Sequence, residues 1–369
     1  MANYDDLKLA VESLSGGKNT VLFDDLGMPS IMVVVPKFKI SDVIDGGPQN
    51  THYAFIVNAV EKDSINISKY QNIVVNGRAY SLPFKDPAVY TTFDQAKSYC
   101  EAKGAGWHLM TNAEWAAIAL WCKKNGFMPR GNNQYGSDVS AAYEKGVQTY
   151  FDSGAGKTGR VATGSGPASW AHDGTNNGIF DLNGNVWEWV GGLRLNKGEI
   201  QIIPDNNAAA GVNQSDTSTL WKAILQDGSL VDPGTAGTLK YDNSVAGDAT
   251  QTDHKVGGNI QLNNAVTNPM YTGDASTNPY YGQNYQTFES IAAASGITVP
   301  TLLKALGLFP VDTSCGGDYI YVRNYGERLP LRGGHWSIGS GAGVFALHLS
   351  HARSTSNNNI GFRSAFVSL

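Results

Sequence analysis

The side chains most able to carry out chemistry are widely spaced in this sequence of 369 residues. The three cysteines, Cys100, Cys122 and Cys315, form no Cys-x-x-Cys motif. The first two lie on helix-like segments and are predicted to be buried thiols, while a disulfide between two of the three stays open. His348 and His351 could share a metal ion, and the alternative is two exposed imidazoles on a binding surface. The sequence contains no P-loop, GxGxxG loop or Gly-x-Ser-x-Gly elbow.

Charge and hydropathy exclude several classes of function. The net charge is −5 and no basic stripe occurs, so we expect no nucleic-acid partner. The longest apolar runs, such as residues 31–35, are far too short to span a bilayer, so we expect no membrane insertion. The first residues lack the basic-then-apolar pattern of a signal peptide. We therefore expect synthesis in a cytoplasm and a cytoplasmic location before assembly, with a role elsewhere, for example on a virus particle.

The elements that must position these side chains are short. The chain has 43 glycines, and only 16% of its residues are charged, which is typical of many turns and short strands. Thr92 with Gln95 and Thr111 with Glu114 fit two capping boxes, so each pair predicts the start of a helix. Runs of β-branched and aromatic residues predict strands at 31–35, 38–40, 54–57, 65–68 and 199–203.

Four sequence segments carry a family signature. They read WHLMTNAEW over 107–115, GIFDLNGNVWEW over 178–189, LRGGHW over 331–336 and NIGFR over 359–363. In this order and spacing they resemble the formylglycine-generating-enzyme (sulfatase-modifying factor) family. The counterparts in that family read roughly RLPTEAEWE, GNVWEW, RGGSW and GFR. The resemblance implies an α+β protein with the C-type lectin fold, which combines a small twisted antiparallel sheet, two helices and long loops.

The resemblance divides the chain into a core and an insertion. We expect a lead-in over 1–28, the first part of the lectin-like core over 29–196, an insertion lobe over 197–315 and the variable remainder of the core over 316–369. The insertion is rich in Asn, Asp, Thr and Gly, yet a helix is predicted to run from Pro300 to Leu306. This helix should bury Leu302, Leu303 and Leu306, and the lobe is expected not to supply the variable site.

The signature residues also have an interpretation as scaffold. Trp187 and Trp189 lie two residues apart, so one face of a strand could bury both indoles together with Phe362 in one core. Arg332 and Arg363 are predicted to reach buried carbonyls or carboxylates, because a guanidinium presents several donors in a rigid plane.

The resemblance does not extend to the enzyme chemistry of the family. Its oxidase binds copper through two cysteines shortly after the RGG motif, and residues 335–363 contain no cysteine. A related iron-dependent branch uses a His-x3-His-x-Glu cluster, and no such string occurs. We therefore expect a non-enzymatic protein that requires no cofactor. The alternative is a metal-dependent oxidoreductase of the same type with an altered active site.

The GNVWEW loop raises the question of a structural metal. In the family this loop can hold Ca²⁺ through a side-chain oxygen, two carbonyls and the glutamate. By position, these ligands correspond to Asp181, Gly184, Val186 and Glu188, and hard oxygen ligands suit Ca²⁺. The alternative is that Glu188 forms a salt bridge or caps a loop.

The C-terminal segment 332–363 resembles the variable proteins of diversity-generating retroelements, several of which have this fold. In such systems an asparagine-rich template is copied with errors at adenines. An asparagine codon becomes His, Ser, Ile, Gly or Thr by changes of adenine alone, and the run 357–359 is still Asn-Asn-Asn. The candidate variable, ligand-binding positions are His335, Ser337, Ile338, Gly341, His348, Ser350, His351 and Thr355.

Alternation in the segment 345–350 suggests how such a site is built. Apolar Phe345, Leu347 and Leu349 should face the core, while His348 and Ser350 lie on the other face and are free to vary. We therefore expect the eight positions to form one exposed patch. The resulting hypothesis is a phage or prophage tail protein that binds a host-cell surface protein or glycan and assembles with other virion tail proteins.

Overall fold

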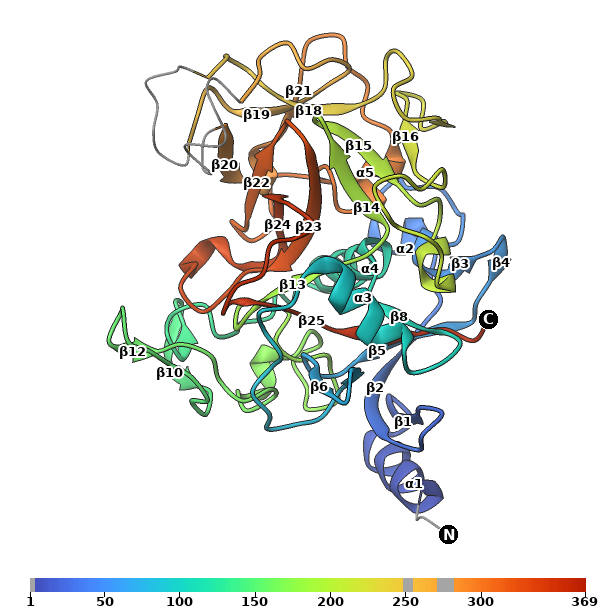
Figure 1. The fold of residues 1–369 in the computed structure, drawn as a ribbon, viewed down its shortest axis with the longest axis vertical. Coiled ribbons are helices and arrows are strands. Elements are labelled where there is room, and N and C mark those ends of the chain that lie inside the picture. Colours follow the sequence, from blue (N-terminus) through green and yellow to red (C-terminus); the bar gives the residue numbers. More distant parts are fainter. Residues whose placement is uncertain (1–3, 248–254, 271–281) are drawn as a thin grey trace.

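The computed structural model describes residues 4–247, 255–270 and 282–369. Short strands and long loops surround a few helices, and strands from the first and last thirds of the chain pair with each other (Figure 1). Within the described residues, none of the helices is both long and apolar enough to cross a lipid bilayer.

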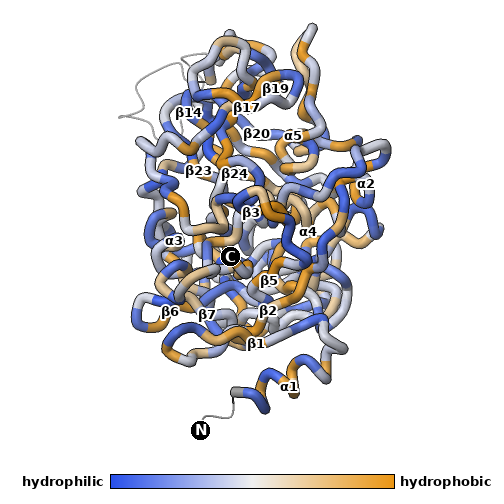
Figure 2. The backbone as a smooth tube through the Cα atoms, turned by 90° about the vertical axis from the view of Figure 1, so that its right-hand side faces the viewer, coloured by the Kyte–Doolittle hydropathy of each residue, from blue (hydrophilic) through white to orange (hydrophobic). Residues whose placement is uncertain are grey.

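Both capping boxes predicted from the sequence begin helices. The Thr92 hydroxyl accepts a hydrogen bond from the Gln95 amide, and the Thr111 hydroxyl accepts one from Glu114. The α-helices are α1 (Tyr4–Ser15), α2 (Ile40–Val43), α3 (Phe93–Glu101), α4 (Asn112–Lys124) and α5 (Thr301–Ala305). Short 3-10 turns are η1 (Tyr53–Phe55), η2 (Ala168–Trp170), η3 (Asn207–Ala210), η4 (Phe288–Ser290) and η5 (Gly339–Gly341). Helix α1 projects from the body of the molecule with Leu9 and Leu14 exposed (Figure 2).

One antiparallel sheet joins the two ends of the chain. Its order is β1 (Asn19–Phe23), β2 (Pro29–Pro36), β5 (Ser64–Ser68), β26 (Ser364–Phe366) and β8 (Trp107–Leu109). The last strand therefore lies between β5 and β8, where Ala365 is paired with Ile67 on one side and His108 on the other. Because the C-terminal strand is central, the C-terminal segment is an integral part of the fold.

A second, larger sheet holds the rest of the C-terminal segment. Its main path is β20 (Gln283–Thr287), β22 (Tyr319–Arg323), β24 (Gly343–His351), β23 (Glu327–Gly333), β14 (Leu193–Asn196), β15 (Glu199–Ile202), β18 (Lys240–Asn243), β19 (Ile260–Asn263) and β21 (Ala292–Ala293). Strand β13 (Trp187–Trp189) pairs with β23 and with β25 (Ile360–Phe362), and β16 (Lys222–Ile224) joins β15 to β17 (Leu230–Val231). Small hairpins are formed by β3 (Ile56–Val57) with β4 (Val60–Glu61), β6 (Ile73–Val75) with β7 (Arg78–Tyr80), β9 (Ser137–Asp138) with β10 (Ala141–Lys145), and β11 (Phe151–Asp152) with β12 (Lys157–Thr158).

The aromatic core predicted from the sequence motifs is confirmed. Trp187, Trp189 and Phe362 are 3%, 0% and 0% exposed and belong to one apolar cluster. The Arg363 guanidinium binds both carboxylate oxygens of Glu188 at 2.6 Å. Arg332 donates to the side-chain oxygen of Asn112 and to the carbonyl of Gly307. The two arginines therefore tie the C-terminal strands to the first part of the chain.

Two expectations about the elements need correction. The predicted strand at 38–40 is wrong, because the Asp42 carboxylate accepts from the Lys39 amide and Ile40 begins helix α2. The segment 54–57 is half 3-10 turn and half strand. In contrast, helix α5 buries Leu302, Leu303 and Leu306 as predicted. Strands β15, β18 and β19 belong to the segment 197–315, which was expected to form an insertion lobe. They continue the large sheet directly from β14.

Candidate functional site

A cavity of about 430 Å³ opens where β13, β20, β22 and β24 meet the loop after β23. We call it the aromatic cavity. It is lined by Trp187, Gln283, Tyr285, Tyr319, Tyr321, His335, Ile338, His348, His351, Asn357, Asn359 and Ile360. Its walls therefore come from four separate stretches of sequence, which the large sheet and the segment before β25 bring together.

His348 lies at the centre of the ring contacts in this cavity. Its imidazole stacks on Tyr321, with ring centroids 4.3 Å apart and planes 15° from parallel. The edge-to-face contact with Trp187 has a centroid distance of 5.3 Å, and the His351 ring lies 4.3 Å away. Tyr285 stacks on Tyr321 at 5.7 Å and extends the aromatic surface outward. Such ring pairs add about 0.5–1.5 kcal/mol each beyond the area that they bury.

Short polar contacts fix the position of the imidazoles. The Ser350 hydroxyl donates to the Gln283 side-chain oxygen at 2.7 Å and lies 3.2 Å from Nδ1 of His348. At the other end of the cavity, the Ser337 hydroxyl lies 3.4 Å from Nδ1 of His335. Because the Ser350 hydroxyl gives its only proton to Gln283, it can accept from Nδ1 of His348 but cannot donate to it, whereas the Ser337 hydroxyl can donate to His335 or accept from it.

The imidazoles of His335 and His351 in the aromatic cavity are uncharged at neutral pH. Burial lowers the pKa of His335 to about 4. Burial, assisted by the positive charges of Arg323 and Arg328, lowers the pKa of His351 to about 4 as well. The described residues that line the cavity include no Asp, Glu, Lys or Arg. The site thus offers aromatic faces, imidazoles and amides, which suit an uncharged ligand group with a flat or ring-shaped surface.

The candidate variable residues are brought together, but they are less exposed than expected. His335, Ile338, His348 and His351 line the cavity. Ser337 and Ser350 each contact one of its histidines, as described above. Thr355 does not line the cavity and donates its amide to the carbonyl of Ala352.

The predicted exposed patch is wrong for three of the eight positions. His348 and Ser350 are only 9% and 5% exposed, and Gly341 is buried. The alternation along β24 is correct, since Phe345, Leu347 and Leu349 lie in the main core. The opposite face is not free, however, because β13 and the side chains of β20 and β22 cover it.

Gly341 does not line the aromatic cavity, but it lies against the ring of Tyr319, which does. A Cβ atom built on Gly341 would lie 2.8 Å from the ring of Tyr319, closer than Cβ contacts normally come. Tyr319 in turn stacks on Tyr285, with ring centroids 5.7 Å apart. The present stacking of Tyr319 on Tyr285 therefore requires a glycine at position 341.

Several lining residues were not predicted from the sequence. Gln283 and Tyr285 come from the segment 197–315, so this segment lines the cavity beside the candidate variable residues although it contains none of the eight positions. Their strand β20 is the partner of β22 at the edge of the large sheet. The alternation Tyr319-Ile-Tyr321 was the one available signal, because it predicts an aromatic face on a strand whose other face buries Ile320.

The described cysteines and histidines do not form a metal centre. Within residues 4–247, 255–270 and 282–369, no group of three His, Cys, Asp or Glu side chains is placed to hold a metal ion. Cys100, Cys122 and Cys315 are buried free thiols, as predicted for the first two. Burial raises the pKa of Cys315 to about 12 and raises the pKa of the other two further, so the reactive thiolate form is disfavoured.

The loop 181–188 does not fit a calcium ion as the sequence suggested. Oxygens of Asp181, Gly184, Val186 and Glu188 do converge, but they converge on the side-chain nitrogen of Gln71. Asp181 contributes its main-chain carbonyl instead of its carboxylate. That carboxylate accepts from the Gly164 amide, and burial raises its pKa to about 6. The alternative given for Glu188, a salt bridge, is the arrangement found with Arg363.

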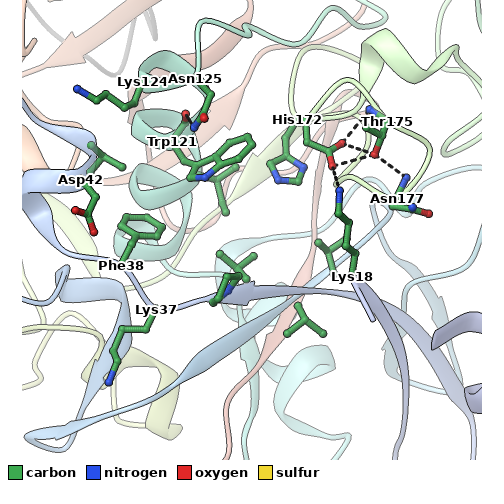
Figure 3. A pocket seen from close by; sticks show the side chains of 17 residues that line it. Lys18, Lys37, Phe38, Asp42, Trp121, Lys124, Asn125, His172, Thr175 and Asn177 are labelled. Carbon is green, nitrogen blue, oxygen red and sulfur yellow. Dashed lines mark hydrogen bonds and ion pairs between the residues drawn. The ribbon is translucent and has the colours of Figure 1, made fainter. Parts of the chain in front are cut away.

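A larger groove of about 770 Å³ lies on another part of the molecule, between β2, α4 and the loop at 172–177 (Figure 3). The rings of Trp121 and His172 lie 5.3 Å apart in it. Nδ1 of His172 accepts from the Ile179 amide, and burial lowers the pKa of His172 to about 4, so this histidine is a neutral structural residue. None of the eight candidate variable residues lines the groove.

Sequence comparison identifies the class of protein. Residues 14–212 match the FGE-sulfatase family, described as the sulfatase-modifying factor enzyme 1-like domain. The match spans more than half of the chain, so the chain belongs to this family, and its fold is the α+β, C-type-lectin-like fold. The strands that carry the aromatic cavity, apart from β13, lie beyond the matched residues.

Two solved structures are similar over almost the whole chain. One is PvdO from Pseudomonas aeruginosa, with 15% identity and a TM-score of 0.34 over 94% of this chain and 97% of that chain. The other is Treponema denticola variable protein 1, with 11% identity and a TM-score of 0.34 over 94% of this chain and 98% of that chain. No curated protein sequence matches this chain.

Proposed function

We propose that this chain is a ligand-binding protein that uses the aromatic cavity as its contact surface and is diversified by a retroelement. The observation that carries this proposal is the convergence of His335, Ile338, His348 and His351 on one cavity. These residues interrupt the apparent framework of the segment 332–363, and each can arise from an asparagine codon by changes of adenine alone. Their convergence, with Ser337 and Ser350 in contact with them, supports a shared role in contacting a ligand.

The composition of the cavity favours a particular ligand chemistry. The neutral imidazoles of His335 and His351, the tyrosine faces and the amides of Gln283, Asn357 and Asn359 offer no charged partner for a phosphate, carboxylate or ammonium group. We propose that the cavity receives an uncharged ring, either a sugar ring or an aromatic side chain, displayed by a host-cell surface glycan or protein. In this hypothesis the chain acts on a phage or prophage tail together with other virion proteins.

A non-enzymatic role is part of the same proposal. The family is named for an enzyme, so a metal-dependent oxidoreductase is the competing hypothesis. The copper-binding cysteine pair of that chemistry is missing from residues 335–363, and the cysteines present are buried. Metal analysis of the purified protein tests this point, because stoichiometric copper or iron would favour the oxidoreductase.

The binding proposal is tested with two matched triple variants. His335→Ala, Ile338→Ala and His351→Ala together remove walls of the aromatic cavity without touching the buried His348. As the control, Ser340→Ala, Ser354→Ala and Ser356→Ala change three exposed serines of the same segment that are not among the eight candidate positions. Both proteins are fluorescently labelled and applied to a glycan array and to candidate host cells, with circular dichroism to confirm folding. Binding by the control but not by the cavity variant supports the proposal, and equal binding by both contradicts it.

The retroelement half of the proposal has its own test. The DNA around the gene should contain a near-repeat of the region that encodes residues 332–363, with asparagine codons at the eight candidate positions. A near-repeat whose differences fall at bases other than adenine would contradict adenine-directed diversification and would leave the binding test unaffected.

A further inference from the structure

The side chain of Gln71 occupies the centre of the loop 181–188. Gln71 is fully buried, and its side-chain nitrogen lies 3.2 Å from the carbonyl oxygens of Asp181 and Val186. The same nitrogen lies 3.5 Å from the carbonyl of Gly184 and 3.0 Å from a carboxylate oxygen of Glu188. One amide group therefore contacts four oxygens that come from a single turn of chain.

The orientation of this amide is determined by its other end. The Gln71 side-chain oxygen accepts a hydrogen bond from the Asn185 side-chain amide at 2.8 Å. Asn185 is itself fixed, because it also donates to the Val161 carbonyl and accepts from the Val161 amide. Since the oxygen of Gln71 must face the donor on Asn185, its NH₂ group must face the four loop oxygens.

The distances and charges suit an amide better than a cation. Calcium holds its oxygen ligands at about 2.3–2.6 Å, whereas an amide donor holds them at about 3 Å or slightly more. The negative charge of Glu188 is already matched by the Arg363 guanidinium, which binds both of its oxygens. A divalent ion at the same centre would lie next to this buried positive charge and would repel it.

We propose that Gln71 replaces a structural cation in this protein, so that the loop 181–188 is closed by a neutral amide and the fold is independent of calcium. The loop leads directly into β13, where Trp187 forms the floor of the aromatic cavity. The Gln71 amide thereby holds Trp187 in position whether or not calcium is present. Ligand binding should then be the same with calcium or with chelator, even though four oxygens are arranged around one point.

The test compares the full-length wild-type protein with two variants of Gln71. Gln71→Glu places a carboxylate beside Glu188, so it should be unstable in EDTA and recover on addition of CaCl₂. Gln71→Met keeps the length of the side chain but removes the amide, so it should be less stable than wild type and should not respond to calcium. The readouts are the melting temperature in 1 mM EDTA and in a CaCl₂ excess of about 100-fold over a micromolar Kd, and direct metal analysis.

We expect wild-type protein purified without chelator to contain no calcium and to melt within ~1 °C in the two buffers, while Gln71→Glu gains at least ~3 °C with CaCl₂. Stoichiometric calcium in wild type, or a melting shift that EDTA reverses, would overturn the proposal. In that event Asp181→Asn should abolish the shift, because one oxygen of the buried Asp181 carboxylate has no hydrogen-bond partner among the described residues and would be free to bind the ion. A Gln71→Glu protein that folds but ignores calcium would also overturn it, because the four oxygens would then not form a cation centre.

Discussion

Two of the three histidines that line the aromatic cavity, His335 and His351, should make the protein sensitive to mild acid. In the folded state His335 and His351 have a pKa of about 4, whereas the unfolded chain titrates near the ordinary value of 6.5. Between these values the unfolded chain binds more protons than the folded one. Their contribution to stability is therefore fully present above pH 6.5 and is lost as the pH falls toward 4.

The size of the effect follows from the two pKa values. At pH 5, a shift from 6.5 to about 4 corresponds to about 2 kcal/mol per imidazole. Both side chains are half-buried rather than fully buried, so solvent screening reduces this value to about 1 kcal/mol each. The double variant His335→Gln, His351→Gln should therefore lose about 2 kcal/mol less stability between pH 7 and pH 5 than the wild-type protein does.

Urea unfolding at pH 7 and pH 5, followed by tryptophan fluorescence, measures this difference. His52 and His172 also have pKa values lowered to about 4 by burial, and they remain in both proteins, so their acid sensitivity cancels in the comparison. The same loss of stability on acidification in the double variant and in wild type would refute the conclusion that His335 and His351 are neutral.

Three further outcomes are expected. Lys103 is 1% exposed beside the Trp107 ring, and burial lowers its pKa to about 7. Thermal melting should therefore show wild-type stability rising from pH 7 toward 10.5, and Lys103→Met should abolish this rise. His348→Ala should cost about 1–3 kcal/mol in urea unfolding because it removes stacked rings, while Thr355→Ala should change stability by less than about 0.5 kcal/mol. Glu188→Gln should cost about 3–5 kcal/mol in the same assay, because it leaves the Arg363 charge buried without its carboxylate; a loss below 1 kcal/mol would contradict this assignment.

Local chemistry made part of the fold predictable. The helices at 93–101 and 112–124 were recognisable because a capping box is complete within four residues. The strand predicted at 38–40 is wrong because of a similar local contact. The Asp42 carboxylate accepts a hydrogen bond from the Lys39 amide, and the chain turns there. Propensity alone could not reveal this local side-chain competition.

Only those features of the site that depend on residues adjacent in the sequence were predictable. Alternation correctly placed Phe345, Leu347 and Leu349 in the core, but it could not show that His348 would be covered by Trp187 and Tyr321. The contacts of Gln71 with the loop 181–188 join residues more than a hundred positions apart. No local pattern in the sequence encodes such pairs. The motif at 181–188 therefore resembles that of calcium-binding relatives even though the Gln71 amide occupies the centre of this loop.

The close approach of Gly341 to Tyr319 means that sequence change can alter specificity without touching a ligand. Any side chain larger than hydrogen at position 341 would press on the Tyr319 ring, and this ring would have to turn away from its stack on Tyr285. The shape of the aromatic cavity would then depend on the volume of a residue that does not line it. Substitution of this single buried residue could thus change which ligands fit, while every residue that lines the cavity stays the same.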